Sequence, residues 1–184
     1  MDVIFGYGSL INPASANKTL GRGMVPDPFP TAVLLGYSRC WDYVSRLRRE
    51  GAAGGGPARA IALNVTTDDT PPDHACNGVL IHVTDDEIER LDLREEGYDR
   101  VDVTAQVTLD VTSSEMVGHV VWTYVARPER RVLPAGAFIA ERYRQIVEEG
   151  LSLYGCAFAD AFHRTTRPSP LPSGRCDYPN APVK

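Results

Sequence analysis

The sequence predicts an α+β protein in which a small mixed, largely antiparallel sheet curls around one core, with a few helices on its flanks. Stretches rich in β-branched and aromatic residues recur along most of the chain, whereas helical periodicity is confined to a few segments. Strands and helices do not alternate strictly, as a doubly wound parallel sheet would require. A length of 184 residues is enough for one well-buried core, so we expect a single domain.

The first strand is expected at Asp2 to Phe5, and a Gly-x-Gly turn follows it directly at Gly6-Tyr7-Gly8. Two glycines allow the backbone to turn sharply without Cβ clashes. The turn would leave several backbone N–H groups directed at one point, where they could hold a carboxylate or a carbonyl oxygen that gains negative charge. The alternative is an ordinary turn at the end of a strand.

Three other functions of such a loop are excluded, because the residues that their motifs require are absent. A dinucleotide-binding fingerprint needs a third glycine where Ile11 stands, and a phosphate loop that ends at Lys18 needs glycine where Asn17 stands. A nucleophile elbow needs glycine where Tyr7 stands, so nothing marks Ser9 as an esterase-type nucleophile.

Between the loop and residue 83, the pattern predicts a short helical turn followed by coil, and then strands. Four prolines interrupt residues 13–30. One or two strands are expected at residues 31–44, and further strands at Ala58 to Val65 and Asn77 to Val83. The loops at residues 51–57 and 66–73 either form a rim over a pocket or simply connect strands at the surface.

A helix is expected to begin at Thr84, because Thr84-Asp85-Asp86-Glu87 has the pattern of a capping box. Ile88 and Leu91 lie on one face of this helix, and Glu95 follows four residues after Leu91 on roughly the same inward face. Gly97 is expected to end the helix. Burial of a carboxyl on such a face would raise its pKa toward the range of a working base.

The last third of the chain predicts a hairpin, two helices and an extended tail. Residues 100–111 alternate as a half-buried strand does, and residues 117–125 are expected to pair with them. Helices are expected at residues 137–150 and 155–165. We place the single domain at residues 1–166 and a Pro-rich tail at residues 167–184, which either wraps the surface or is disordered.

Composition excludes several classes of function. A net charge of −5 argues against nucleic-acid binding, and no apolar run is long enough to span a membrane. The N-terminus shows no secretory leader pattern, so we expect a cytoplasmic protein. The four cysteines are scattered, without a Cys-x-x-Cys pair or a histidine partner at ligand spacing, so we expect no metal.

Two motifs together resemble the γ-glutamylcyclotransferase family. One is Phe5-Gly6-Tyr7-Gly8-Ser9-Leu10-Ile11 directly after an N-terminal strand, and the other is Leu91-Asp92-Leu93-Arg94-Glu95. The resemblance implies a small mixed barrel with flanking helices, no cofactor, and a general acid/base glutamate at Glu95. The glutathione-degrading branch is nearest in pattern, although Leu93 replaces its aromatic residue and the following turn has one glycine fewer, which leaves Glu96 as the alternative base.

The resemblance also implies a set of substrate-binding residues. Arg39 falls in a Gly-Tyr-x-Arg-x-Trp pattern, and Tyr143 either closes the pocket with its hydroxyl or is a core tyrosine. The full set is Ile4, Phe5, Gly6, Tyr7, Gly8, Ser9, Leu10, Arg39 and Tyr143.

The implied reaction is cyclisation of the γ-glutamyl group of a small molecule to 5-oxoproline, with release of an amine. The released amine is open among glutathione's dipeptide, an amino acid and a simple amine. Two competing hypotheses are a non-catalytic binding module on the same fold and an amidase that uses Ser9. The amidase would release free glutamate, and no histidine lies in a motif context that would serve Ser9.

Overall fold

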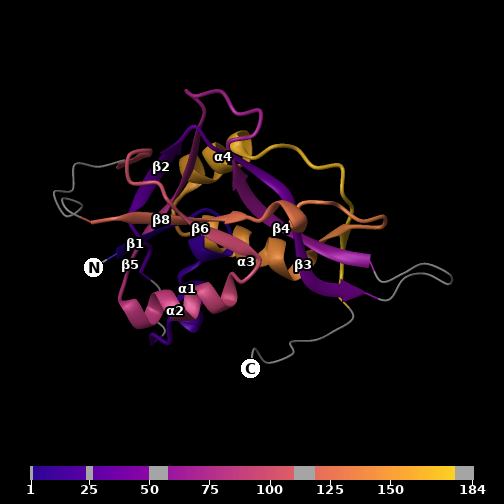
Figure 1. The fold of residues 1–184 in the computed structure, drawn as a ribbon, viewed down its shortest axis with the longest axis horizontal. Helices are drawn as coiled ribbons and strands as arrows, with labels where there is room; N and C mark the ends of the chain where they lie inside the picture. The colour runs from indigo at the N-terminus through magenta and orange to yellow at the C-terminus, as the bar shows by residue number, and fades with distance from the viewer. Residues whose placement is uncertain (1, 24–26, 50–57, 110–118, 177–184) are drawn as a thin grey trace.

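The computed structural model describes residues 2–23, 27–49, 58–109 and 119–176, and its strands form two sheets (Figure 1). The larger sheet has six strands in the order β6-β8-β1-β5-β2-β7. Its strands are β1 Asp2–Gly6, β2 Thr31–Leu35, β5 Ala75–Val83, β6 Tyr98–Asp102, β7 Val107–Leu109 and β8 Val121–Ala126.

The smaller sheet has four strands in the order β10-β9-β4-β3. Its strands are β3 Ser38–Arg49, β4 Ala58–Thr66, β9 Phe138–Ala140 and β10 Ser173–Gly174. The helices are α1 Pro13–Leu20, α2 Asp85–Arg94, α3 Glu141–Leu151 and α4 Cys156–Thr165, with 3₁₀ turns η1 Ser9–Ile11 and η3 Pro128–Arg130.

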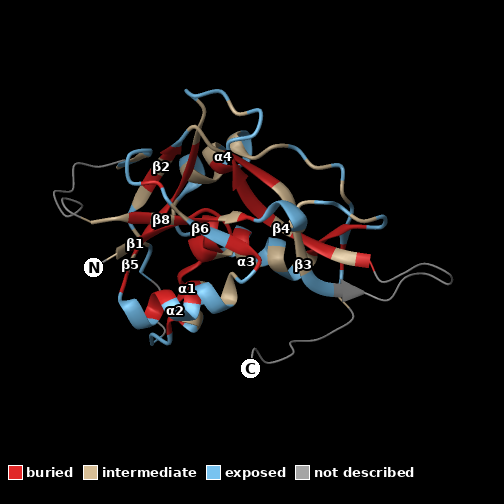
Figure 2. Cartoon of the chain, in the orientation of Figure 1, coloured by how far each residue is buried: buried red, intermediate tan, exposed pale blue. Residues whose placement is uncertain are grey.

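Strand β1 lies in the middle of the larger sheet and of the core. It pairs antiparallel with β5 and parallel with β8, and Val3, Ile4 and Phe5 are fully buried. A continuous apolar run is what a strand covered on both faces requires. Figure 2 shows that buried residues are concentrated in these central strands. The loop after β1 is therefore attached to a strand that is held in place by the core.

The two sheets are joined by hydrogen bonds that cross from one to the other. The Ala126 N–H donates to Asn64 Oδ1 at 2.8 Å, and the Tyr98 hydroxyl donates to the Leu63 carbonyl at 2.9 Å. The predicted mixed, largely antiparallel α+β architecture is confirmed, since the ladders are antiparallel except for β1/β8, β4/β9 and β9/β10. The described ladders make two sheets, and closure into a barrel stays a prediction.

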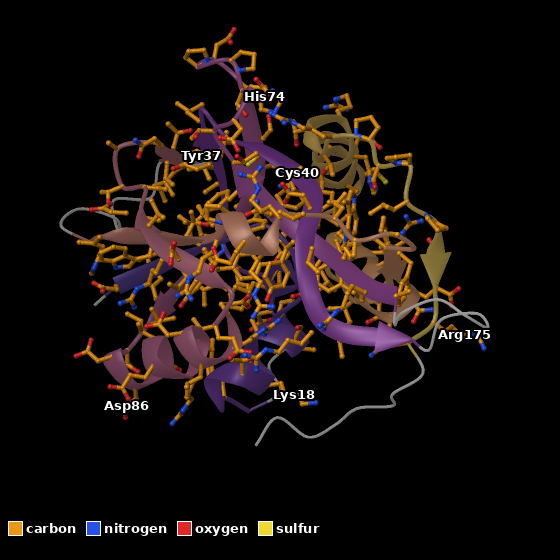
Figure 3. All side chains as sticks on the ribbon, turned by 45° about the vertical axis from the view of Figure 1, so that its right-hand side comes forward. Lys18, Tyr37, Cys40, His74, Asp86 and Arg175 are labelled. Atoms are coloured by element: carbon orange, nitrogen blue, oxygen red, sulfur yellow. The ribbon has the colours of Figure 1, made fainter. Side chains whose placement is uncertain are left out.

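Helices α1 and α2 pack against each other beside the N-terminal loop (Figure 1). In Figure 3, Lys18 of α1 and Asp86 of α2 mark one end of the molecule, and His74 marks the opposite end. Helix α1 is longer than the short turn expected, because the Asn12 side chain accepts the Ala14 and Ser15 N–H groups at its start. The loop and the end of α2 are thereby neighbours.

Helix α2 begins as predicted after Thr84, whose N–H donates to Glu87 Oε2 at 2.9 Å. It ends at Arg94, earlier than the glycine suggested, and Glu95 is the C-cap residue. Gly97 has a different function, because a Cβ at that position would overlap the Tyr43 hydroxyl. Glu95 therefore leaves the helix in the turn that leads to β6.

Two predicted elements are wrong in their extent. The alternating segment from residue 100 onward is two strands at opposite edges of the larger sheet, β6 and β7, separated by a turn in which Asp102 Oδ1 accepts the Thr104 N–H. Strand β8 does pair with β6 as expected, whereas β7 pairs with β2, and residues 110–118 lie outside the described residues. Residues 138–140, expected to be helical, form β9 beside β4, so α3 begins at Glu141.

The described part of the Pro-rich tail runs along the smaller sheet. Residues 173–174 pair with β9, and the Arg167 N–H donates to the Arg39 carbonyl at 2.7 Å. The glycine-rich loop at residues 51–57 and the last residues of the tail lie outside the described residues. Among the helices that are described, none combines the length and apolar character needed to span a membrane.

Candidate active site

The loop after β1 presents backbone N–H groups at the start of a 3₁₀ turn. The bonds of this turn begin with the Ile11 N–H, which donates to the Gly8 carbonyl at 3.0 Å. The N–H groups of Gly8, Ser9 and Leu10 precede that first bond, so the turn itself does not use them. These are the donors that the sequence predicted for an oxygen of a ligand.

A small cavity of about 30 Å³ lies against this loop. Its walls combine the loop, one carboxyl group and four tyrosines. The lining residues are Phe5, Tyr7, Gly8, Ser9, Leu10, Leu63, Glu95, Tyr98, Tyr124 and Tyr143. A volume of this size holds one or two water molecules, so a larger ligand must displace side chains.

Glu95 is the carboxyl group of this cavity. Its side chain is 17% exposed, and its Oε1 lies 3.1 Å from Nε of Arg94. Burial raises the pKa of Glu95 above its ordinary value, and the Arg94 charge partly opposes that rise. A carboxyl group with a raised pKa can both accept and return a proton close to neutral pH.

Tyr7, Tyr98 and Tyr124 form walls that stay uncharged near neutral pH. Burial raises the pKa of each hydroxyl above its ordinary value. Their protons are held in hydrogen bonds within the protein: Tyr7 donates to the Tyr124 carbonyl at 2.7 Å and Tyr124 donates to Asp92 Oδ1 at 2.8 Å. These neutral walls keep the local dielectric constant low, which strengthens electrostatic interactions inside the cavity.

Tyr143, from α3, brings its hydroxyl oxygen to the donors of the loop. This oxygen accepts the Leu63 N–H at 3.3 Å, and a hydrogen bond from the Ser9 backbone also reaches it. Burial raises the pKa of Tyr143 to about 12. The hydroxyl oxygen therefore occupies a point where two backbone N–H groups converge, as an oxygen of a bound ligand would.

A second, wider pocket of about 370 Å³ adjoins the first. Glu95, Tyr98 and Tyr124 line both pockets. Glu96 lines only the outer one, where its carboxylate pairs with Arg46 at 2.6 Å. The two neighbouring glutamates therefore differ in position: Glu95 lies where the pockets meet, and Glu96 lies in the outer pocket.

Three of the residues expected to bind substrate lie outside the cavity lining. Ile4 is buried within β1, and Gly6 packs against Leu10. Arg39 is fully buried beneath the loop, where its Nε donates to the Tyr7 carbonyl at 2.9 Å and its guanidinium lies 3.7 Å from the centre of the Phe162 ring. Arg39 thus supports the loop from below.

The structure also adds residues that the sequence did not single out. Tyr98 lies three residues after Glu95, and this closeness to the second motif was a signal that could have been used. Tyr124 and Leu63 come from separate strands and had no local signal. Among the described residues, no three side chains of the His, Cys, Asp and Glu types gather in a metal-binding arrangement.

Solved structures of similar architecture identify the fold. The chain matches YkqA from Bacillus subtilis with a TM-score of 0.60 and 18% identity, over 94% of this chain and 56% of that chain. It matches the yeast γ-glutamyl cyclotransferase specific to glutathione with a TM-score of 0.59 and 16% identity, over 90% of this chain and 96% of that one. This is the γ-glutamylcyclotransferase fold.

A further structure, described as a γ-glutamyl cyclotransferase, matches at a TM-score of 0.59 and 12% identity, over 96% of this chain and 94% of that chain. The chain spans little more than half the length of YkqA but nearly the whole length of the two cyclotransferases. No protein-family model and no curated protein sequence matches the chain. At these identities the likeness establishes the fold, and function must be argued from the site.

Proposed function

We propose that the protein is a γ-glutamylcyclotransferase-type enzyme, which converts the γ-glutamyl group of a small molecule to 5-oxoproline and releases an amine. The observation that carries this proposal is the meeting of a largely buried carboxyl, Glu95, with the N–H groups of the Gly8-Ser9-Leu10 turn in one cavity. The γ-glutamylcyclotransferase fold supports it.

In the proposed reaction, the α-amine of the substrate attacks its own side-chain carbonyl carbon. A C–N bond forms to that carbon, and the bond to the leaving nitrogen breaks, so no protein nucleophile is needed. The amine must first lose a proton, because its reference pKa of about 8 leaves most of it charged at neutral pH. Glu95 accepts that proton.

Glu95 then returns the proton to the leaving nitrogen, and the second proton of the attacking nitrogen follows the same route. The loop N–H groups and the Leu63 N–H, now occupied by the Tyr143 hydroxyl, would hold the substrate carboxylate or the oxygen that becomes negative. The outer pocket beyond Glu95 would receive the leaving amine. No covalent enzyme intermediate is formed.

The main alternative is a non-catalytic binding module on the same fold. A module of this kind does not need a carboxyl group with a raised pKa, and burial of one costs stability. The hypothesis of a Ser9 amidase has less support, because Ser9 Oγ accepts a hydrogen bond from Arg94 at 2.8 Å and no histidine lines the cavity in the part of the chain described.

A donor panel tests the proposal. Purified protein is incubated with glutathione, γ-glutamyl-alanine, a γ-glutamyl-amine and an α-glutamyl dipeptide, and both 5-oxoproline and glutamate are quantified. We expect 5-oxoproline from at least one γ-glutamyl donor and none from the α-glutamyl dipeptide. Release of glutamate in its place would favour the amidase, and no product from any donor would favour the binding module.

A matched donor with an acetylated α-amine separates binding from chemistry. Ring closure uses that amine, so the blocked donor should inhibit competitively without being consumed. Consumption of the blocked donor would contradict intramolecular attack.

A further inference from the structure

Arg94, immediately before Glu95, connects the two halves of the cavity. It is the last residue of α2, and its side chain reaches α1 and the loop after β1. Its Nη2 donates to Ser9 Oγ at 2.8 Å, and its Nε lies 3.1 Å from Glu95 Oε1. One guanidinium group thus contacts both the donor loop and the carboxyl group.

The remaining N–H groups of Arg94 bind α1. Nη1 donates to Thr19 Oγ1 at 2.7 Å and to the Ser15 carbonyl at 3.2 Å, and Nη2 also lies 3.3 Å from Ser15 Oγ. A guanidinium carries its N–H donors in a rigid plane, and here Nη1 and Nη2 each have two acceptors while Nε forms the ion pair with Glu95. The group is therefore held in one position, unlike a solvated arginine.

From this geometry we propose that Arg94 is a positioning residue, which fixes the donor loop relative to the Glu95 carboxyl through its simultaneous contacts with Ser9 and Glu95. The inference rests on the proposed function. It assigns the Ser9 hydroxyl an anchoring role as an acceptor for Arg94. A displacement of about 1 Å between a substrate and a catalytic group can cost about a hundredfold in rate, so such an anchor has a measurable effect.

Arg94 also forms an ion pair with Glu95 and so acts on its charge. The other titratable groups that line the cavity around Glu95 are tyrosines, and burial raises the pKa of each of them: Tyr7, Tyr98, Tyr124 and Tyr143. Tyr43 also has a pKa raised by burial, and the charged side chains of the outer pocket are Asp92, Glu96, Asp99, Arg100 and Arg127. Removal of the Arg94 charge should leave burial less opposed and raise the pKa of Glu95 further.

The test compares Arg94→Gln, Arg94→Lys and the control Arg90→Gln. Arg90 lies one turn earlier on α2 and also donates to α1, at the Leu20 carbonyl, but none of its hydrogen bonds goes to Ser9 or Glu95. Steady-state kinetics across pH on the best γ-glutamyl donor give kcat, KM and the acidic limb of kcat/KM. Thermal unfolding measures the loss of contacts to α1.

For Arg94→Gln we expect kcat/KM to fall at least about tenfold and its acidic limb to move to higher pH. Arg94→Lys should keep the acidic limb of kcat/KM at the wild-type pH, because the positive charge remains. It should still lower the rate, because one ammonium group cannot contact Ser9 and Glu95 together as the planar guanidinium does. Arg90→Gln should lower the Tm less than Arg94→Gln, because Arg90 donates to the Leu20 carbonyl whereas Arg94 donates to Ser9, Ser15 and Thr19, and it should keep both the rate and the limb. Equal kinetic effects from Arg90→Gln and Arg94→Gln would reduce Arg94 to a structural contact and overturn the proposal.

A measurement without substrate separates this proposal from the proposed function. The Glu95 carboxyl carbon, labelled with ¹³C and assigned by its loss in Glu95→Gln, is titrated by NMR in wild type, Arg94→Gln and Arg90→Gln. Its pKa should rise in Arg94→Gln only. If no donor reacts but this shift occurs, the proposed function fails and the coupling of Arg94 to Glu95 holds; an unchanged titration in Arg94→Gln would contradict the coupling.

Discussion

The substitution Gly8→Ala tests whether the loop after β1 binds its ligand through backbone N–H groups. A Cβ built on Gly8 lies 2.8 Å from the Tyr143 hydroxyl oxygen and 3.6 Å from Leu63 Cβ. The first distance is shorter than side-chain Cβ atoms show, so the hydroxyl must move away. Its bonds from the Leu63 and Ser9 N–H groups are then lost or stretched.

Each of these hydrogen bonds contributes about 1 kcal/mol to stability, so Gly8→Ala should cost about 1–2 kcal/mol. For a domain of this size, that loss corresponds to a Tm lower by about 2–8 °C. The effect on activity should be larger, because the new methyl group lies where the ligand oxygen approaches the loop. We expect kcat/KM to fall about a hundredfold or more.

Gly23→Ala is the matched control, because a Cβ at Gly23 meets nothing within 4 Å. It should keep wild-type Tm and activity. In Gly8→Ala combined with Tyr143→Phe, the oxygen that the methyl group strikes is gone, so part of the stability should return while activity stays low. Wild-type kcat/KM in Gly8→Ala, measured by 5-oxoproline release, would refute the reasoning about the loop.

Three further predictions concern residues around the loop. The acidic limb of kcat/KM should lie at higher pH than for a surface glutamate, because Glu95 must be ionised to accept a proton and burial raises its pKa; a limb near pH 4 would contradict this. Tyr143→Phe should lower KM, because no hydroxyl then competes for the Leu63 N–H, whereas a tenfold higher KM would mean that the hydroxyl contacts substrate. Arg39→Met should destabilise the fold by about 3 kcal/mol or more, because the Tyr7, Asn77 and Phe162 carbonyls lose their buried donor; a Tm within 2 °C of wild type would contradict that role.

The fold class was predictable because most of its signals are local. The apolar run of β1 and the capping residues of α2 each depend on neighbours in the sequence. The errors arose where tertiary pairing overrides local pattern. Residues 138–140 have helical neighbours but pair with β4, and the turn at Asp102 divides an alternating stretch that would otherwise continue as one strand.

The site was predictable to the extent that its residues lie in the two motifs. Glu95 and the Gly8-Ser9-Leu10 turn, which line one cavity, could be singled out because each is marked by its immediate neighbours, and their roles stay a prediction. Leu63 and Tyr124 reach the cavity from separate strands, and only the pairing of the sheets reveals them. Arg39 was expected at the pocket because it falls in a Gly-Tyr-x-Arg-x-Trp pattern that resembles a strand of the family, but here it is a buried donor to backbone carbonyls.

The pH dependence of protein stability offers an independent check on the raised pKa of Glu95. A carboxyl group whose pKa is higher in the folded than in the unfolded protein lowers stability as the pH rises from the unfolded pKa to the folded one. Above that window the full cost is present. Glu95→Gln should therefore keep or raise the Tm at neutral pH, as expected for a group retained for chemistry.

The most direct test of the account is 5-oxoproline release by wild type, Glu95→Gln and Glu96→Gln on the best γ-glutamyl donor. The two glutamines have the same size and lie at adjacent positions, but only residue 95 lines the inner cavity. The account predicts that Glu95→Gln retains a folded protein and loses nearly all turnover, while Glu96→Gln stays within about twofold of wild type. Equal losses in both variants, or a loss in Glu96→Gln alone, would contradict the assignment of Glu95 as the acid and base of the reaction.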